Sequence, residues 1–283
     1  MSYFHVSQFS EPFKIHYLIF DYVGNSIPLV CVHGIIRNCR DFDYLAISLS
    51  KHCKVICPDI IGRGKSSWIK NLTLYNYSTY CKSIIYLLQH LKINKINFLG
   101  TSMGGIIGMY LAAYFPKLIN SLILNDIGPF IDIVPLKKIA EYISNIPKFN
   151  NVSSAKHYLQ KMLYNFKITQ KEHWDHIVKY SIIKQQNDYI IAADPKISIA
   201  FNDTIKSIHN MNMWDVWKKI KSKTLVLRGS QSDILTRDTL KKMIELNPIT
   251  DYIEYPNIGH NPSLMENYQI KDIQDWLIVN SLL

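Results

Sequence analysis

A serine between two glycines is the residue of this chain best placed to act as a nucleophile. Ser102 lies in the run Gly100–Gly104 (Gly-Thr-Ser-Met-Gly), with apolar residues at 96–99 before it and at 106–112 after it. A G-x-S-x-G pattern between a strand and a helix predicts a sharp turn in which the serine is exposed and its flanking glycines allow close approach. The helix that begins there directs free N–H groups toward the position where an oxyanion forms during acyl transfer.

A serine hydroxyl becomes a strong nucleophile only beside a base, and an imidazole base needs an acid on its far nitrogen. His260 follows the last expected strand, and Asp233 follows the strand before it. Carboxyl ends of parallel strands meet at one edge of a sheet, so the predicted catalytic residues are Ser102, Asp233 and His260. Asp126 is the alternative acid, because it too follows a strand. A second interpretation of Asp126–Pro129 is an ordered loop that leads from the sheet into the predicted cap.

Acyl transfer also needs two hydrogen-bond donors for the oxyanion. The predicted turn supplies the backbone N–H of Met103. The loop after the first parallel strand, His33-Gly34-Ile35, offers the N–H of Ile35 as the second donor. His33 itself is interpreted as a structural hydrogen-bonding residue and not as a second base.

Two polar residues in that same loop are candidates for substrate binding. Arg37 and Asn38 could reach a polar or carboxylate end of a substrate. An equally good interpretation of Arg37 is an ion pair with Asp41 four residues later.

The surrounding pattern predicts an α/β fold with a mostly parallel sheet, because short apolar runs alternate with helical spacing. The expected strands are 29–32, 55–57, 96–99, 122–124, 224–227 and 252–255, and the expected helices are 42–50, 77–90, 105–115, 238–246 and one from 265 onward. After residue 129 this alternation stops until residue 224. We therefore predict a core of residues 1–129 and 214–283, with residues 130–213 inserted as a helical cap.

Several aromatic and histidine side chains of the predicted cap could line a binding pocket, although packing is the more common role of aromatics at helical spacing. They are Trp174, Tyr180, Tyr189, Trp214 and Trp217, together with His157, His173, His176 and His209.

Composition excludes several classes of protein. The chain has 283 residues, 48% of them hydrophobic, which is ample for a large core. Its formal net charge of +10 accompanies abundant Ile, Asn and Tyr and has no long basic run, so we expect no nucleic-acid partner. No apolar stretch approaches the ~18 residues of a membrane span. The residues 1–10 have no signal-peptide character, which predicts a cytoplasmic protein.

The five cysteines are odd in number and lie without C-x-x-C spacing, so they are expected to be reduced and mostly buried. No His, Cys or Glu cluster has the sequence spacing of a metal site, and no metal is expected.

Taken together, these motifs resemble the α/β-hydrolase superfamily, and within it a group of capped bacterial serine hydrolases. The resemblance rests on His33-Gly34, the D-x-x-G-x-G-x-S run 59–66, the elbow Gly100–Gly105, Ser232-Asp233 and Gly259-His260. It implies an eight-stranded core, a cap inserted after the sixth strand, a lid over the site and a serine triad that needs no cofactor. A serine at the nucleophile position argues against the dehalogenase and epoxide hydrolase branches, which use a carboxylate there.

The leading functional hypothesis is hydrolysis of a carboxylic ester with a small or medium acyl group, through an acyl-enzyme. Two alternatives use the same machinery: a carbon–carbon bond hydrolase of ring-fission products, and a methyl esterase acting on an acidic acyl-carrier protein. A different class is a non-catalytic binding protein built on the same fold.

Overall fold

The computed structural model of the chain describes residues 2–283 and places eight strands in one mixed sheet, in the order β1-β2-β4-β3-β5-β6-β11-β12. Strands β3 to β6, β11 and β12 run parallel, whereas β2 pairs antiparallel with both β1 and β4. The strands are β1 (Ser2–Val6), β2 (Phe13–Phe20), β3 (Leu29–Val32), β4 (Val55–Pro58), β5 (Ile96–Thr101), β6 (Ile119–Asn125), β11 (Lys223–Gly229) and β12 (Thr250–Tyr255).

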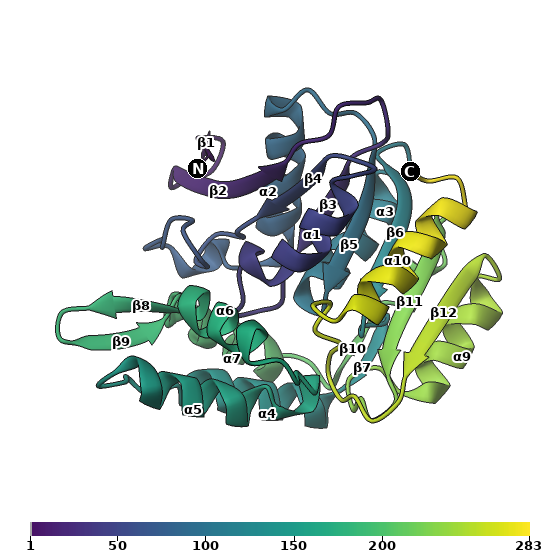
Figure 1. Cartoon of the computed structure of the whole chain (residues 1–283). Coiled ribbons are helices and arrows are strands. Elements are labelled where there is room, and N and C mark those ends of the chain that lie inside the picture. Colours follow the sequence, from purple (N-terminus) through teal and green to yellow (C-terminus); the bar gives the residue numbers. More distant parts are fainter. Residues whose placement is uncertain (1) are drawn as a thin grey trace.

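Helices cover both faces of this sheet, as Figure 1 shows for α1 and α10 on one face and α2 and α3 on the other. Helix α2 begins after Asn76, whose side chain accepts from the amide of Thr79, and α3 ends ahead of Pro116. The bounds are α1 (Asp43–Leu49), α2 (Tyr77–His90), α3 (Met103–Tyr114), α8 (Trp214–Trp217), α9 (Arg237–Leu246) and α10 (Asn267–Val279).

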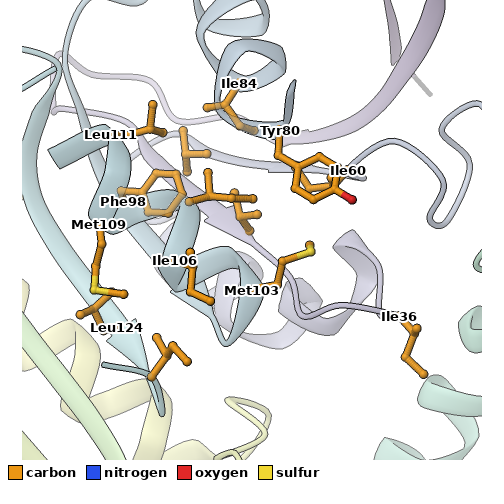
Figure 2. Packing of buried hydrophobic residues seen from close by; sticks show 14 of the residues in the cluster. Ile36, Ile60, Tyr80, Ile84, Phe98, Met103, Ile106, Met109, Leu111 and Leu124 are labelled. Carbon is orange, nitrogen blue, oxygen red and sulfur yellow. The ribbon is translucent and has the colours of Figure 1, made fainter. Parts of the chain in front are cut away.

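The core has two layers because successive side chains of a strand point to opposite faces. In β3, Leu29 packs in the layer beneath α1 and α10, whereas Val30 packs in the layer beneath α2 and α3. Figure 2 shows part of the second layer, where Phe98 of β5 lies among residues of α2 and α3. Full burial of a side chain of this size stabilises the fold by about 1.5–3 kcal/mol.

Between β6 and β11 the chain leaves the sheet and forms a separate layer at the carboxyl ends of the parallel strands (Figure 1). A two-stranded ladder of β7 (Phe130–Asp132) and β10 (Asn210–Asn212) brings the two ends of this segment together. The segment also contains α4 (Ile133–Ser144), α5 (Val152–Met162), α6 (Lys171–Ser181), β8 (Ile182–Gln185), β9 (Asp188–Ile191) and α7 (Lys196–Lys206).

The strand and helix pattern expected for the core agrees with the structure, but β1, β2 and the short strands β7 to β10 were not predicted. The last four make the inserted layer less purely helical than expected, because β8 and β9 form a hairpin. Within residues 2–283, no helix has the length and apolar character needed to cross a bilayer.

Candidate active site

Ser102 lies at the turn between β5 and α3 in a backbone conformation that L-residues rarely adopt, with φ 51° and ψ −113°. The turn is tight enough to require its glycines. A Cβ on Gly104 would lie 2.0 Å from the carbonyl oxygen of Val32, and a Cβ on Gly100 would lie 2.3 Å from the backbone of Gly104. The glycines therefore permit the close contact of β5, α3 and β3 that presents the serine hydroxyl.

The imidazole of His260 lies between this serine and a carboxylate. Its Nε2 is 3.1 Å from Oγ of Ser102, and its Nδ1 is 2.7 Å from Oδ2 of Asp126. Because the carboxylate accepts at Nδ1, that nitrogen carries the proton and Nε2 is free to accept the proton of the serine hydroxyl. The three side chains thus form a continuous hydrogen-bonded chain.

Asp126 is fully buried, and its carboxylate accepts two further hydrogen bonds that fix its position. The amide of Gly229 donates to Oδ1 at 2.9 Å, and the hydroxyl of Ser232 donates to Oδ2 at 2.6 Å. Ser232 was named only as part of the family resemblance, and its role as a donor to Asp126 was not predicted. Charge-assisted hydrogen bonds of this kind fix the orientation of a carboxylate.

The structure does not place Asp233 against His260, which corrects the expectation from chain order. The side chain of Asp233 is 58% exposed and lies 3.7 Å from the ammonium group of Lys138. The reason is the direction of the chain after β11: Ser232 directs its hydroxyl to Asp126, whereas Asp233 lines the cavity beside Lys138.

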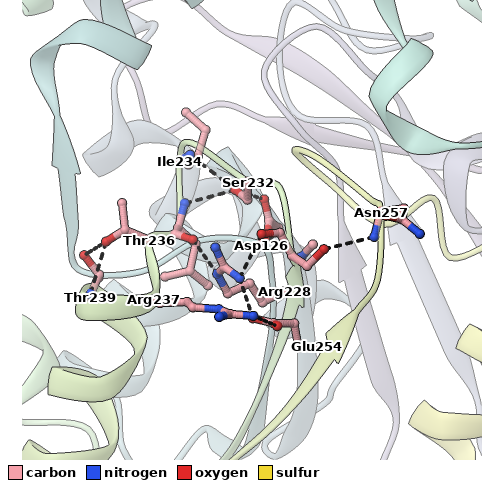
Figure 3. A network of polar contacts seen from close by, with 12 residues as sticks. Asp126, Arg228, Ser232, Ile234, Thr236, Arg237, Thr239, Glu254 and Asn257 are labelled. Carbon is pink, nitrogen blue, oxygen red and sulfur yellow. Dashed lines mark hydrogen bonds and ion pairs between the residues drawn. The ribbon is translucent and has the colours of Figure 1, made fainter.

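The loop that carries Ser232 is held by Arg228, as Figure 3 shows. The guanidinium of Arg228 donates to the carbonyl oxygen of Leu235 at 2.7 Å and pairs with Glu254 of β12. Ser232 also accepts from the amides of Ile234 and Leu235. These contacts fix the inward direction of the Ser232 hydroxyl.

Two backbone amides are free to bind an oxyanion. Within residues 2–283, neither the N–H of Ile35 nor that of Met103 donates to a protein acceptor. His33 stabilises this loop: the amide of Ile60 donates to its Nε2 at 3.0 Å, and its Nδ1–H donates to the carbonyl oxygen of Gly34 at 2.8 Å. Burial lowers the pKa of His33, so the imidazole stays neutral and acts as a structural bridge.

Asp59 braces the same loop from beneath. Its carboxylate accepts from the amides of Cys39 (2.7 Å) and Lys65 (2.9 Å) and from Nδ1 of His16 (2.7 Å). His16, Cys39 and Asp59 come together only in the tertiary structure and are of metal-ligating types. Both carboxylate oxygens are already occupied by these donors, so the cluster is suited to holding the loop.

We expect Asp59→Asn to lower the free energy of unfolding by about 2–4 kcal/mol at pH 7, because an amide nitrogen would face N–H donors. Burial alone raises the pKa of Asp59, but the hydrogen bonds from His16, Cys39 and Lys65 outweigh it and hold this pKa below its ordinary value of 3.8. The ionised group therefore stabilises the fold above about pH 4, and this contribution is lost as the pH falls through the folded-state pKa. Urea unfolding from pH 7 to pH 3 should show the difference between wild type and variant shrinking below pH 4. A difference that is independent of pH would contradict this account.

Arg37 and Asn38 bind protein groups in the structure. Arg37 forms an ion pair with Asp41 and donates to Oγ of Ser181 at 2.7 Å, and Asn38 donates to the carbonyl oxygen of Tyr180 at 2.8 Å. The pairing of Arg37 with Asp41 was the alternative interpretation. Together the two residues tie the loop after β3 to the end of α6.

A cavity of about 320 Å³ opens onto Ser102 and His260. The inserted layer contributes Tyr142, Met162 and Phe166 to its wall, and Lys138 lies at its edge beside Asp233. None of the five aromatic residues proposed as pocket residues lines this cavity; Trp217, for example, is fully buried and donates to the carbonyl oxygen of Met243.

The fold and this arrangement define a hydrolase-like protein, and comparison with known families agrees. Residues 27–266 match the model of the alpha/beta hydrolase fold family. The chain belongs to this family.

Relatives and solved structures cover most of the chain. A 3-hydroxybutyrate-oligomer hydrolase of Cupriavidus necator is 31% identical over 87% of each chain, and an sn-1-specific diacylglycerol lipase of Danio rerio is 26% identical over 89% of this chain and 78% of its own. Among solved structures, a candidate hydrolase from Rickettsia typhi is 36% identical with a TM-score of 0.92 over 98% of both chains. An alpha/beta hydrolase from Novosphingobium aromaticivorans is 29% identical with a TM-score of 0.88 over 98% of this chain and 97% of its own.

Proposed function

We propose that this protein is a serine ester hydrolase in which Ser102 is the nucleophile, His260 the base and Asp126 the acid. The observation that carries the proposal is the continuous contact from Ser102 through His260 to buried Asp126, at 3.1 Å and 2.7 Å, at the wall of a cavity. Asp126 replaces Asp233 as the proposed acid because only Asp126 reaches the imidazole.

The proposed reaction begins when Nε2 of His260 takes the hydroxyl proton of Ser102 as its oxygen attacks the ester carbonyl. The amides of Ile35 and Met103 donate to the resulting oxyanion, and each such donor contributes about 3–4 kcal/mol to the lowering of the barrier. The imidazolium then gives its proton to the departing alcohol, which leaves an acyl-enzyme. Water, deprotonated by His260, releases the acid and restores the hydroxyl of Ser102.

The names of the relatives support an ester as the substrate, and one of them suggests which esters to examine first. The relative from Cupriavidus necator acts, by its name, on oligomers of 3-hydroxybutyrate, which are short chains joined by ester bonds. We propose short esters of hydroxy acids as the first substrate class to examine. A carbon–carbon hydrolase receives less support, because the carboxylate of Asp41 already neutralises Arg37.

We also propose that residues 130–213 act as a lid that selects substrates. Support comes from the side chains that α4 and α5 place in the cavity wall, including Tyr142 and Met162. The carboxyl-end position of the inserted layer is where ligands bind in α/β sheets.

The experiment that tests the proposed function is labelling by a fluorophosphonate, followed by hydrolysis of p-nitrophenyl esters from acetate to octanoate. Wild type should be labelled stoichiometrically and hydrolyse the shorter esters, whereas Ser102→Ala should lose labelling and at least about 10⁴-fold in kcat. Ser230→Ala is the matched control, since Ser230 lies on the loop after β11 and donates nothing to His260. Labelling that persists in Ser102→Ala, or its absence in wild type, would refute the proposal.

A further inference from the structure

A second cavity, of about 180 Å³, lies beyond the proposed oxyanion donors. Ile35 and Met103 form part of its wall, and α7 closes it with Ala200 and Phe201. Most of the other residues that line this cavity are apolar residues or tyrosines. Among all the residues that line it, the only charged side chain is that of Arg63.

The guanidinium of Arg63 is buried without an acidic partner. The residue is 1% exposed, and within residues 2–283 it forms no ion pair. The nearby carboxylate of Asp194 is instead bound by the hydroxyl of Tyr75 at 2.7 Å and by the amide of Lys196. A buried charge that lacks a counter-charge is strongly disfavoured, so most buried arginines are paired.

Neutral acceptors satisfy only part of this guanidinium. Its Nε donates to the carbonyl oxygen of Ile35 at 2.7 Å, and its Nη1 donates to the carbonyl oxygen of Ile61 and the hydroxyl of Tyr80. Nη2, in contrast, has a single hydrogen-bond acceptor among residues 2–283, the thioether sulfur of Met103 at 3.4 Å. Sulfur is a weak acceptor, so the two N–H groups of Nη2 remain available to a stronger one.

Backbone and ring contacts position Arg63. Its backbone pairs with Ala193 at the end of the β8–β9 hairpin, and the ring of Tyr80 lies 4.9 Å from its Cζ. Figure 2 shows Met103 and Tyr80 on the same side of the core, with the Met103 side chain directed toward Tyr80. A flexible methionine can move aside for a ligand.

We propose that Arg63 binds a carboxylate of the substrate in this second cavity, so that the enzyme prefers esters that carry a free acid group. The inference rests on the proposed ester hydrolysis and adds to it a recognition site for the anionic end. An incoming carboxylate would displace the Met103 sulfur from Nη2 and supply the missing counter-charge. Ile35 lines both cavities, so a substrate that extends past Ile35 would place its carboxylate at Arg63 while its ester group lies at Ser102.

Two pairs of substrates test the proposal, one for each side of the ester bond. The first pair is mono-p-nitrophenyl glutarate against p-nitrophenyl valerate, and the second is the 3-hydroxybutyrate dimer against its methyl ester. We expect wild type to prefer the acidic member of at least one pair by about 10- to 100-fold in kcat/KM, and Arg63→Gln to abolish this preference. Lys206→Gln removes one positive charge from exposed α7 and should keep the preference.

A binding measurement separates this proposal from the proposed hydrolysis. Glutarate should bind Ser102→Ala in calorimetry, and glutaramide should bind it at least about tenfold more weakly. Ala200→Phe, which fills the cavity while leaving Arg63 intact, should abolish glutarate binding, and Ala200→Ser should retain it. This second variant keeps the test decisive if Arg63→Gln does not fold.

Three outcomes would overturn the proposal. One is equal kcat/KM for acidic and neutral esters in wild type, with ester hydrolysis still dependent on Ser102. Another is a preference that Lys138→Gln removes and Arg63→Gln retains, which would assign it to the lysine at the edge of the first cavity. A third is equal loss of rate for both members of each pair in Arg63→Gln, which would make Arg63 a brace of the Ile35 loop only.

Discussion

Replacing Asp126 by asparagine is expected to lower kcat by about 10³- to 10⁴-fold, a loss of the size found when a triad aspartate becomes an amide. The amide group would present an N–H to His260 and favour the tautomer whose Nε2 carries the proton, so that the imidazole could no longer accept the proton of Ser102. The fold should survive, because asparagine has nearly the same shape and its oxygen can still accept from Gly229. Steady-state hydrolysis of p-nitrophenyl butyrate measures the effect.

The matched control for this prediction is Asp233→Asn, which changes the same functional group on the neighbouring strand's loop. Among the described residues 2–283, its exposed carboxylate forms an ion pair only with Lys138, and it makes no contact with His260, so kcat should change by less than about threefold. Ser232→Ala should fall between the two variants, since it removes one of the hydrogen bonds that orient Asp126. Loss of turnover in Asp233→Asn with near-normal turnover in Asp126→Asn would restore the acid predicted from chain order.

Replacing Gly104 by alanine is expected to destabilise the protein by about 3–5 kcal/mol or to prevent folding. The added Cβ would lie 2.0 Å from the carbonyl oxygen and 2.6 Å from the carbonyl carbon of Val32, and these are backbone atoms of a central strand. Relief of the overlap requires separation of α3 from β3, which would also displace Ser102. Chemical denaturation and the yield of soluble protein report the loss.

Gly34→Ala is the control for the Gly104 prediction. An added Cβ there would meet its nearest atoms at 3.8 Å and beyond, which is ordinary van der Waals contact. Its free energy of unfolding should stay within about 1 kcal/mol of wild type. A Gly104→Ala protein as stable as Gly34→Ala would mean that the elbow tolerates a side chain at this position.

Much of the core could be predicted because its signals are local. The short apolar runs at 29–32 and 96–99, and the helical spacing of 77–90, depend only on near neighbours along the chain. Strands β1 and β2 were not predicted, because exposed and buried positions mix in them and no crossover helix separates them. Strand β1 is the edge of the sheet, and β2 pairs with both β1 and β4. The β8–β9 hairpin interrupts a segment whose flanks are strongly helical.

In the candidate site, too, some features follow from local sequence and others depend on tertiary contacts. By itself, the sequence determined the elbow at Ser102 and the position of His260 after the last strand, because a G-x-S-x-G turn and a strand order are properties of short segments. Tertiary structure alone decided which carboxylate meets the imidazole, since Asp126 and Asp233 follow adjacent strands and differ only in how their loops turn. It also decided that Arg63 is buried without a counter-charge, because burial and pairing depend on residues as distant along the chain as Ile35 and Ala193.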